Sequence, residues 1–127
     1  MSDSVFTKII RGEIPCEKIY EDHKNVALLT IKPVQPGHTL VVPKKQIDHL
    51  WDLSDEDYQS LLAAAKKVAN RMRQVLDARR VGIKVEGVEV PHAHIHLIPF
   101  NTVQDYNQPA KSASAGELAK MAKKLAF

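Results

Sequence analysis

Hydrophobic and polar positions follow one another along the chain with two different periods, which divide it into helices and strands. Residues 4–11 carry apolar side chains at helical spacing, and Gly12 and Pro15 end that segment. Short runs of β-branched and apolar residues between turn residues predict strands instead. These strands are expected at residues 18–22, 25–31, 38–42, 81–86 and 92–99.

The clearest element is a long helix that begins after Ser54. The Ser54 side chain is placed to cap it, with Asp57 as the partner in a capping box, and Arg79 and Arg80 stand where cations complement the end of a helix. Its apolar positions form one stripe, which predicts that the helix covers one face of a sheet. The stripe consists of Tyr58, Leu61, Leu62, Ala65, Val68, Ala69, Met72, Val75 and Leu76.

A shorter helix is expected near the C-terminus, where Ser114 and Glu117 form another capping box ahead of an apolar face. The polar stretch 101–113 before it predicts a loop. Strands, then a helix, then strands indicate an α+β protein with an antiparallel sheet. We expect one domain over residues 1–127, with its core at about 5–100 and a C-terminal loop and short helix at 101–127.

Composition narrows the class of protein without identifying its function. The chain has 127 residues, of which 44% are hydrophobic and 26% charged, a balance typical of globular proteins. Its one cysteine, Cys16, excludes an intrachain disulfide, and the sequence has neither a signal peptide nor a membrane-spanning run, so we expect a cytoplasmic protein with no membrane partner. The net charge of +3 suits an anionic ligand such as a phosphate but predicts no nucleic-acid binding.

The segment Pro91-His-Ala-His-Ile-His-Leu-Ile-Pro99 carries the strongest chemical signal. His92, His94 and His96 stand at alternate positions, which a strand displays on one face, whereas in a helix their rings would diverge. The residues between them are apolar and are expected to pack inward. Three histidines in strict alternation are hard to explain by core packing, so we interpret them as a functional site.

Two kinds of chemistry use such a row of histidines. Alternate histidines on a strand form a good zinc pair, although further ligands would have to come from Cys16, His23, His38 or His49. Alternatively, a histidine that is largely neutral at pH 7 acts as a nucleophile, and its neighbours donate hydrogen bonds to phosphate oxygens or a proton to the leaving group. His38, at the start of another strand, would be the fourth histidine of such a site.

With these motifs in view, the chain resembles the histidine-triad (HIT) family, and within it the Hint-like branch. The resemblance extends from about Val5 to Pro99 and rests on three motifs in the same order. They are Phe6-Thr-Lys-Ile-Ile-Arg-Gly-Glu-Ile-Pro15, Lys32-Pro-Val-Gln-Pro-Gly-His-Thr-Leu-Val-Val-Pro-Lys44 and His92-Ala-His-Ile-His-Leu-Ile98. The resemblance implies a HIT-like fold, with a five-stranded antiparallel sheet, one long helix and short terminal helices, paired into a homodimer.

The same resemblance implies hydrolysis or transfer of a nucleoside monophosphate, of AMP or GMP type, from a phosphoramidate, an acyl nucleotide or a dinucleotide. His94 would be the nucleophile that forms a nucleotidyl-histidine intermediate, assisted by His92, His96 and His38 and without a cofactor. The substrate would be a purine nucleotide. The residues that fall where the family lines its base and ribose pocket are Val5, Phe6, Ile9, Leu28, Thr30 and Ile31.

Three departures from the family's pattern bear on activity. Thr30 stands where many members carry an acidic residue or asparagine for the ribose hydroxyls, and one hydroxyl cannot make a bidentate charged contact. The segment 86–92 is several residues shorter than usual and lacks a Gly-Gln pair that meets the phosphate. Members that bind zinc use a Cys-x-x-Cys and a later histidine, whose positions here hold Ser4, Thr7 and Gln46, so no structural metal is expected.

Two rival functions therefore stay open beside a nucleotide hydrolase that acts through His94. One is a nucleotide-binding or regulatory protein with little turnover, which Thr30 and the short segment 86–92 favour. The other is a metal-dependent hydrolase that uses the three histidines as ligands. Burst release of a leaving group would distinguish an enzyme from a binder, and stoichiometric metal in the purified protein would reveal the metal enzyme.

Overall fold

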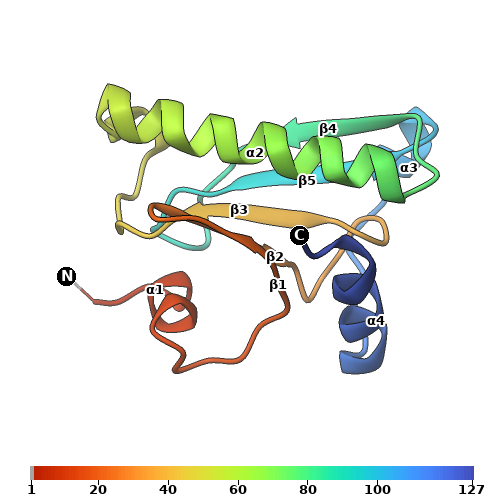
Figure 1. The fold of residues 1–127 in the computed structure, drawn as a ribbon, viewed down its shortest axis with the longest axis horizontal. Helices are drawn as coiled ribbons and strands as arrows, with labels where there is room; N and C mark the ends of the chain where they lie inside the picture. The colour runs from red at the N-terminus through yellow and green to blue at the C-terminus, as the bar shows by residue number, and fades with distance from the viewer. Residues whose placement is uncertain (1) are drawn as a thin grey trace.

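The computed structural model describes residues 2–127 and is built around one five-stranded sheet, covered by helices (Figure 1). The strands lie side by side in the order β1-β2-β3-β5-β4, and every neighbouring pair is antiparallel. The predicted α+β class with a five-stranded antiparallel sheet is therefore confirmed. The strands are β1 (Lys18–Glu21), β2 (Asn25–Leu29), β3 (Thr39–Pro43), β4 (Arg80–Lys84) and β5 (Ile95–Phe100).

One long helix dominates the helical part, and Figure 1 shows it running alongside the strands. Within residues 2–127, none of the helices combines the length and the apolar character that crossing a membrane requires. The helices are α1 (Val5–Ile10), α2 (Asp55–Val75), α3 (Val103–Tyr106) and α4 (Ala115–Leu125), with a short 3-10 turn at Leu50–Asp52.

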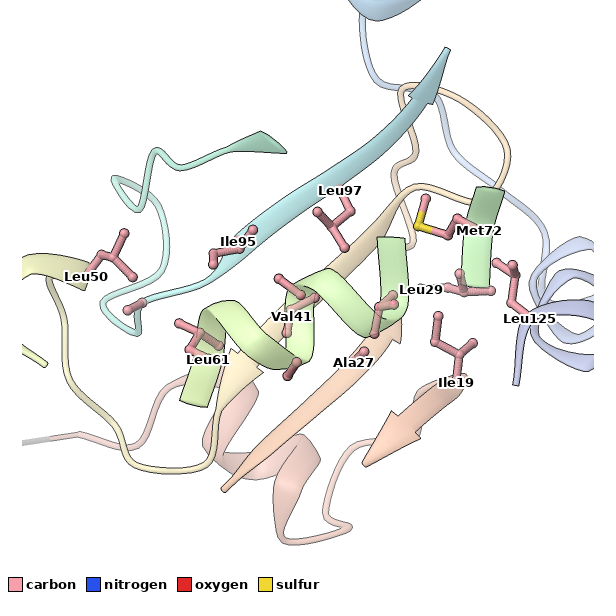
Figure 2. Packing of buried hydrophobic residues seen from close by; sticks show 14 of the residues in the cluster. Ile19, Ala27, Leu29, Val41, Leu50, Leu61, Met72, Ile95, Leu97 and Leu125 are labelled. Carbon is pink, nitrogen blue, oxygen red and sulfur yellow. The ribbon is translucent and has the colours of Figure 1, made fainter. Parts of the chain in front are cut away.

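The larger apolar cluster lies between α2 and one face of the sheet (Figure 2). Leu61 and Met72 of α2 are fully buried there, with Val41 of β3 and Ile95 of β5 in the same cluster. Every residue of the stripe predicted for the long helix belongs to this cluster or packs against it, which confirms that prediction. Full burial of a leucine, valine or methionine side chain such as Leu61 or Met72 stabilises the fold by about 1.5–3 kcal/mol.

The C-terminal helix α4 packs into the same cluster through the apolar face that the sequence predicted. Leu125 is fully buried and Ala122 nearly so. The Arg71 guanidinium of α2 donates hydrogen bonds to backbone carbonyl groups at the end of α4, including that of Leu125 at 3.0 Å. The backbone N–H of Phe127 donates to the carbonyl of Ile19 in β1. The last residues of the chain are thereby attached to its first strand.

A smaller apolar cluster lies on the opposite face of the sheet, beneath α1. Phe6 of α1 belongs to it, and Ile9 and Ile10 pack against it, as predicted for the N-terminal helix. Ser4 begins α1 by accepting a hydrogen bond from the backbone N–H of Thr7. The sheet contributes Val26, Leu28, Leu40 and Val42.

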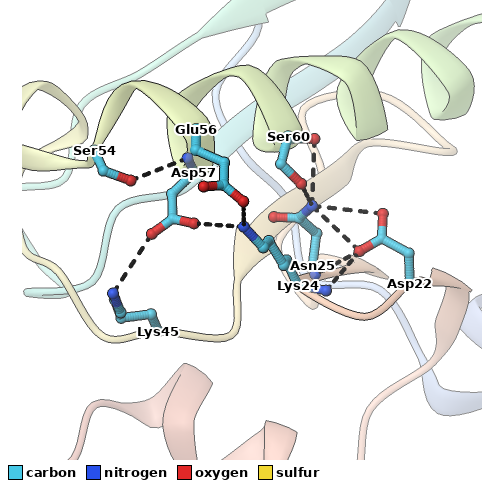
Figure 3. Close-up of polar contacts among 8 residues, drawn as sticks. All are labelled: Asp22, Lys24, Asn25, Lys45, Ser54, Glu56, Asp57 and Ser60. Atoms are coloured by element: carbon cyan, nitrogen blue, oxygen red, sulfur yellow. Dashed lines mark hydrogen bonds and ion pairs between the residues drawn. The ribbon is translucent and has the colours of Figure 1, made fainter.

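Polar contacts attach the start of α2 to the turn between β1 and β2 (Figure 3). Lys24 in that turn pairs with Glu56 at 2.8 Å and with Asp57 at 3.1 Å. Ser54 caps α2 by accepting a hydrogen bond from the backbone N–H of Asp57, as predicted. The Asp57 carboxylate, however, faces Lys24 and Lys45, so only half of the predicted capping box forms.

The predictions for the end of the long helix and for the segment 101–113 were wrong. Helix α2 ends at Val75 and β4 begins at Arg80, so neither Arg79 nor Arg80 complements the end of the helix. Asn101 holds the intervening residues as a turn, because it accepts from the backbone N–H of Arg79 and donates to the carbonyl of Asp77. The segment 101–113, predicted as a loop, contains α3, which begins with a capping box formed by Thr102 and Asp105.

Candidate functional site

The row of histidines lies only partly in a strand. Strand β5 begins at Ile95, so His96 belongs to it, whereas His92 and His94 precede it, contrary to the predicted strand over 92–99. The backbone does not continue the sheet there because the N–H of Ala93 donates to the carbonyl of Ile47 and the N–H of His92 donates to that of Val90.

The predicted alternation of the side chains nevertheless holds across this boundary. Ala93, Ile95 and Leu97 pack into the cluster under α2. The His94 and His96 rings lie on the other side with their centroids 5.1 Å apart, and the Phe6 ring presents an edge to His94 at 4.9 Å. The histidines therefore share the face of the sheet that carries α1.

The hydrogen bonds of His92 define its tautomer. Its Nε2 lies 2.7 Å from the carbonyl oxygen of Pro43, and because that oxygen can only accept, Nε2 carries the proton. Its Nδ1 is then an acceptor and lies 2.7 Å from the Oγ of Ser4. Burial lowers the pKa of His92, in keeping with a neutral ring.

His94 has the opposite arrangement. Its Nδ1 lies 2.7 Å from the carbonyl oxygen of His92, so Nδ1 carries the proton. The proton on Nδ1 leaves the lone pair of a neutral ring on Nε2, for which no partner is found within residues 2–127. A histidine nitrogen in this state is a nucleophile.

The rings of His38 and His96 are joined by a hydrogen bond whose donor can be assigned. The backbone N–H of Val34 donates to Nδ1 of His38 at 3.0 Å, so the His38 proton is on Nε2, which lies 2.9 Å from Nδ1 of His96. Donation from His38 leaves the proton of His96 on its own Nε2. Burial is the main reason that the pKa of each ring is lowered to about 4, so both are neutral at pH 7.

Charged residues lie beside this pair at the edge of the sheet. Lys84 of β4 is the register partner of His96, and its ammonium lies 2.7 Å from the Glu86 carboxylate. The hydrogen bond between them raises the pKa of Lys84 and lowers that of Glu86. Neither residue was predicted as part of the site. The register of β4 against β5, which depends on tertiary pairing, is the signal that places them there.

Only some of the six residues predicted to line a nucleotide pocket lie together in the structure. Phe6, Ile9 and Leu28 meet in the smaller apolar cluster. Val5 is 40% exposed and Ile31 is 68% exposed. These positions alone do not test the predicted pocket.

Thr30, the remaining predicted pocket residue, lines a cavity of about 410 Å³ together with His38. That cavity extends along the segment that precedes α4 and along α4 itself, where Lys111 and Met121 contribute to its wall. Neither this cavity nor a second one beside Lys24 and Asp57 is lined by His94, which is 7% exposed.

The positions Ser4, Thr7 and Gln46 meet around Nδ1 of His92. Their oxygens are neutral, and each is already hydrogen-bonded within the group, for example Thr7 Oγ1 to Gln46 Oε1 at 2.6 Å. Neutral hydroxyl and amide oxygens are poor zinc ligands beside thiolates, so these residues do not fit a structural zinc ion. In the part of the chain that the structure describes, no three His, Cys, Asp or Glu side chains are arranged to hold a metal ion.

Comparisons with known proteins agree with this geometry. The HIT domain family model matches residues 11–103. An adenosine 5'-monophosphoramidase of Saccharomyces cerevisiae is 35% identical over 127 aligned residues, which cover 95% of this chain and 79% of the yeast protein. An uncharacterized HIT-like protein of Borreliella burgdorferi is 37% identical, with 78% of this chain and 76% of that protein covered.

Solved structures give the same result for the fold. A Hit-like protein from Bartonella henselae superposes with a TM-score of 0.88 and 30% identity, covering 97% of this chain and 93% of that one. A zinc-bound histidine triad family protein from Mycobacterium smegmatis has a TM-score of 0.81 and 28% identity, covering 95% and 88%. The sheet, the long helix and the histidine row therefore identify the chain as a member of the HIT family, with the HIT fold.

Proposed function

We propose that this protein hydrolyses or transfers nucleoside monophosphates through a covalent bond to Nε2 of His94. The observation that carries the proposal is the hydrogen-bond network, which leaves the lone pair of His94 Nε2 beside the unpaired proton of His96 Nε2. The name of the yeast relative, an adenosine 5'-monophosphoramidase, supports the choice of a phosphoramidate as substrate.

In the proposed reaction, Nε2 of His94 attacks the α-phosphorus and the bond from phosphorus to the leaving nitrogen breaks. The leaving nitrogen takes a proton from His96 Nε2 or from water. His38 orients the His96 ring through the hydrogen bond from its Nε2 to His96 Nδ1. Water then attacks the same phosphorus and gives a proton back to the group that protonated the leaving nitrogen. The bond between phosphorus and Nε2 of His94 breaks, which releases the nucleoside monophosphate and restores the lone pair on His94. An acyl nucleotide or a dinucleotide would react in the same way, but the bond that breaks would join the α-phosphorus to a leaving oxygen instead of a leaving nitrogen.

The proposed site for the base is the apolar surface next to the histidines. Phe6, Ile9 and Leu28 supply apolar contacts there, and the proposal adds the exposed Val5 and Ile31 and also Thr30, which lines the cavity beside His38. Apolar contacts favour the base with the larger apolar surface, and a purine offers a larger apolar surface than a pyrimidine. A purine nucleotide is therefore the proposed substrate.

One observation favours the rival function, a nucleotide-binding protein with little turnover. His94 is only 7% exposed and lines neither of the two cavities described above, so this structure leaves little of its ring open to a substrate. The metal-dependent alternative is less well supported. Both ring nitrogens of His92 and of His38 already have partners, which leaves two free histidine nitrogens where a catalytic zinc site uses three protein ligands.

The proposal is tested by mixing the protein with adenosine 5'-phosphoramidate and recording intact mass under mildly alkaline denaturing conditions. We expect a transient adduct of one AMP per chain, and no adduct in His94→Gln. With a substrate whose leaving group fluoresces, the enzyme gives a burst that approaches one equivalent per site. Nucleotide binding without a burst would support the binding protein, and turnover that a chelator abolishes would support the metal enzyme.

We also propose that the protein forms a homodimer. The edge strand β4 leaves its backbone edge unpaired within residues 2–127 and Ile83 57% exposed, and such an edge offers a self-complementary surface for two-fold pairing. Sedimentation at micromolar concentration is expected to give twice the mass of the chain. A monomer under those conditions would overturn this part of the proposal.

A further inference from the structure

The start of α1 makes a continuous set of hydrogen bonds with His92, although the two are far apart in sequence. Ser4 Oγ lies 2.7 Å from His92 Nδ1 and accepts from the backbone N–H of Thr7 at 3.0 Å. The hydroxyl of Thr7 and the backbone N–H of Ser4 both donate to Gln46 Oε1, at 2.6 and 2.8 Å. The His92 ring is fully buried, and Ser4 is 5% exposed.

When the His92 ring is neutral, the hydrogen bond between Ser4 and His92 can have only one direction. Because Nε2 of His92 donates to the carbonyl of Pro43, Nδ1 must accept, and Ser4 is therefore the donor. Ser4 Oγ also accepts from Thr7, and Gln46 accepts twice and donates from Nε2 to the carbonyl of Ser2. Every polar group around the buried ring is thus satisfied without an ion.

His92 links this set to the proposed nucleophile through its own backbone. Its ring is held by Ser4 on one side and by Pro43 on the other, and its carbonyl oxygen accepts from Nδ1 of His94 at 2.7 Å. A change in the position of the His92 ring therefore moves the carbonyl that orients the His94 ring.

We propose that Ser4, Thr7 and Gln46 are positioning residues, a hydrogen-bonded clamp that fixes His92 and thereby aims Nε2 of His94. The effect of the clamp on turnover rests on the proposed function, but the clamp itself is observable without any substrate. Helix α1 is then part of the catalytic apparatus as well as a cover for the smaller apolar cluster.

A helix-capping role alone would make a different prediction, and the chain provides a matched control. Ser54 caps α2 through the same contact, with its Oγ 3.1 Å from the backbone N–H of Asp57, and it has no contact with the histidines. Ser4→Ala and Ser54→Ala therefore remove equivalent caps. Only Ser4→Ala removes a donor to His92.

The first measurement is the protonation of the ring nitrogens by long-range ¹H–¹⁵N correlation NMR on the unliganded protein. In the parent, we expect a bare Nδ1 on His92 and a protonated Nδ1 on His94. Ser4→Ala is expected to shift the resonances of both rings, and Ser54→Ala to shift neither. A protonated Nδ1 on His92 in the parent, or rings that do not respond to Ser4→Ala, would overturn the clamp.

The second measurement separates kcat from KM with adenosine 5'-phosphoramidate. We expect Ser4→Ala to lower kcat about ten- to a hundredfold by misaligning the nucleophile, with KM nearly unchanged. Ser4→Thr, which keeps the hydroxyl, restores most of that loss. Adding Gln46→Ala to Ser4→Ala brings less further loss than Gln46→Ala causes alone, because both act through one network.

Equal losses in Ser4→Ala and Ser54→Ala, additive effects, or a loss confined to KM would each contradict the clamp. If Ser4→Ala does not fold, Gln46→Ala tests the same network from its far, half-exposed end. If the parent forms no adduct on His94, the proposed function fails while the ring-nitrogen spectra still decide whether the clamp exists.

Discussion

The two faces of the sheet bury very different residues. Under α2 the buried side chains are mostly apolar, and they extend from β1 to β5 in one cluster. Under α1 a small apolar cluster adjoins His38, His92 and His94, which are all buried, together with Ser4. Buried imidazoles reduce stability unless their nitrogens find partners, which explains why so many hydrogen bonds converge on this face.

This contrast teaches that the larger cluster supplies stability and leaves the other face free to hold polar groups in chosen orientations. If that division is correct, substitutions on the α2 face will change the free energy of unfolding more than kcat. Substitutions among the histidines will do the reverse.

The largest effect is expected for His94→Ala. Loss of a covalent nucleophile lowers kcat by about four orders of magnitude or more, while the melting temperature changes little. Steady-state turnover of adenosine 5'-phosphoramidate is the measurement, with the exposed His49→Ala as the control. Turnover within tenfold of the parent would exclude His94 as the nucleophile.

The next effect concerns the opposite face. Leu61 is fully buried under α2, so Leu61→Ala is expected to lower the free energy of unfolding by about 2–5 kcal/mol and to leave kcat of the folded protein unchanged. Denaturant titration measures the first quantity. Leu62 is only partly buried, so Leu62→Ala should cost less. A kcat that falls as steeply as stability would break the division between the faces.

A smaller effect should follow acidification. The pKa values of His38 and His96 are lowered to about 4 by burial, whereas in the unfolded chain they lie near 6.5. The unfolded chain therefore takes up protons that the folded protein does not, and stability falls as pH decreases from 6.5 towards 4, by a few kcal/mol at most. Nearby Lys84 opposes, and Glu86 favours, protonation of His96.

Chemical denaturation at a series of pH values measures this dependence. The same slope is expected in His49→Gln, because that ring is exposed. A free energy of unfolding that stays constant between pH 6.5 and 4.5 would mean that the buried rings titrate as they do in the unfolded chain.

The smallest effect, none, is expected from a chelator. Ser4, Thr7 and Gln46 satisfy one another and His92 by hydrogen bonds, so EDTA should leave the melting temperature unchanged. About one zinc per purified chain, together with a lower melting temperature in EDTA, would contradict this expectation. It would also revive the interpretation of the histidines as metal ligands.

Much of the α2 face could be predicted from sequence because its signal is local. The apolar stripe of the long helix repeats with the helical period, and each member contacts the cluster. The end of that helix could not be predicted, because it depends on Asn101, which holds the turn between Asp77 and Arg79 from a distant position. Helix α3 was missed because four residues are too few to show a repeated helical period.

The histidine face divides in the same way. Alternation correctly placed the rings of His94 and His96 on one side, since it follows from backbone geometry alone. The start of β5 and the contact between Ser4 and His92 depend on pairing across long stretches of chain. The sequence shows that Ser4, Thr7 and Gln46 depart from the zinc-binding pattern, but only the folded structure shows that these three residues lie together.

The attachment of Phe127 to Ile19 has a consequence for how the protein is made. The main apolar cluster contains Ile19 near the beginning of the chain and Leu125 at the end of α4. During synthesis, β1 leaves the ribosome long before Leu125 does, so the side of β1 that Leu125 covers stays exposed until α4 emerges. The core therefore cannot be completed until the segment that ends with Leu125 has left the ribosome, and before that point the exposed apolar side of the nascent sheet is open to aggregation or to chaperone binding.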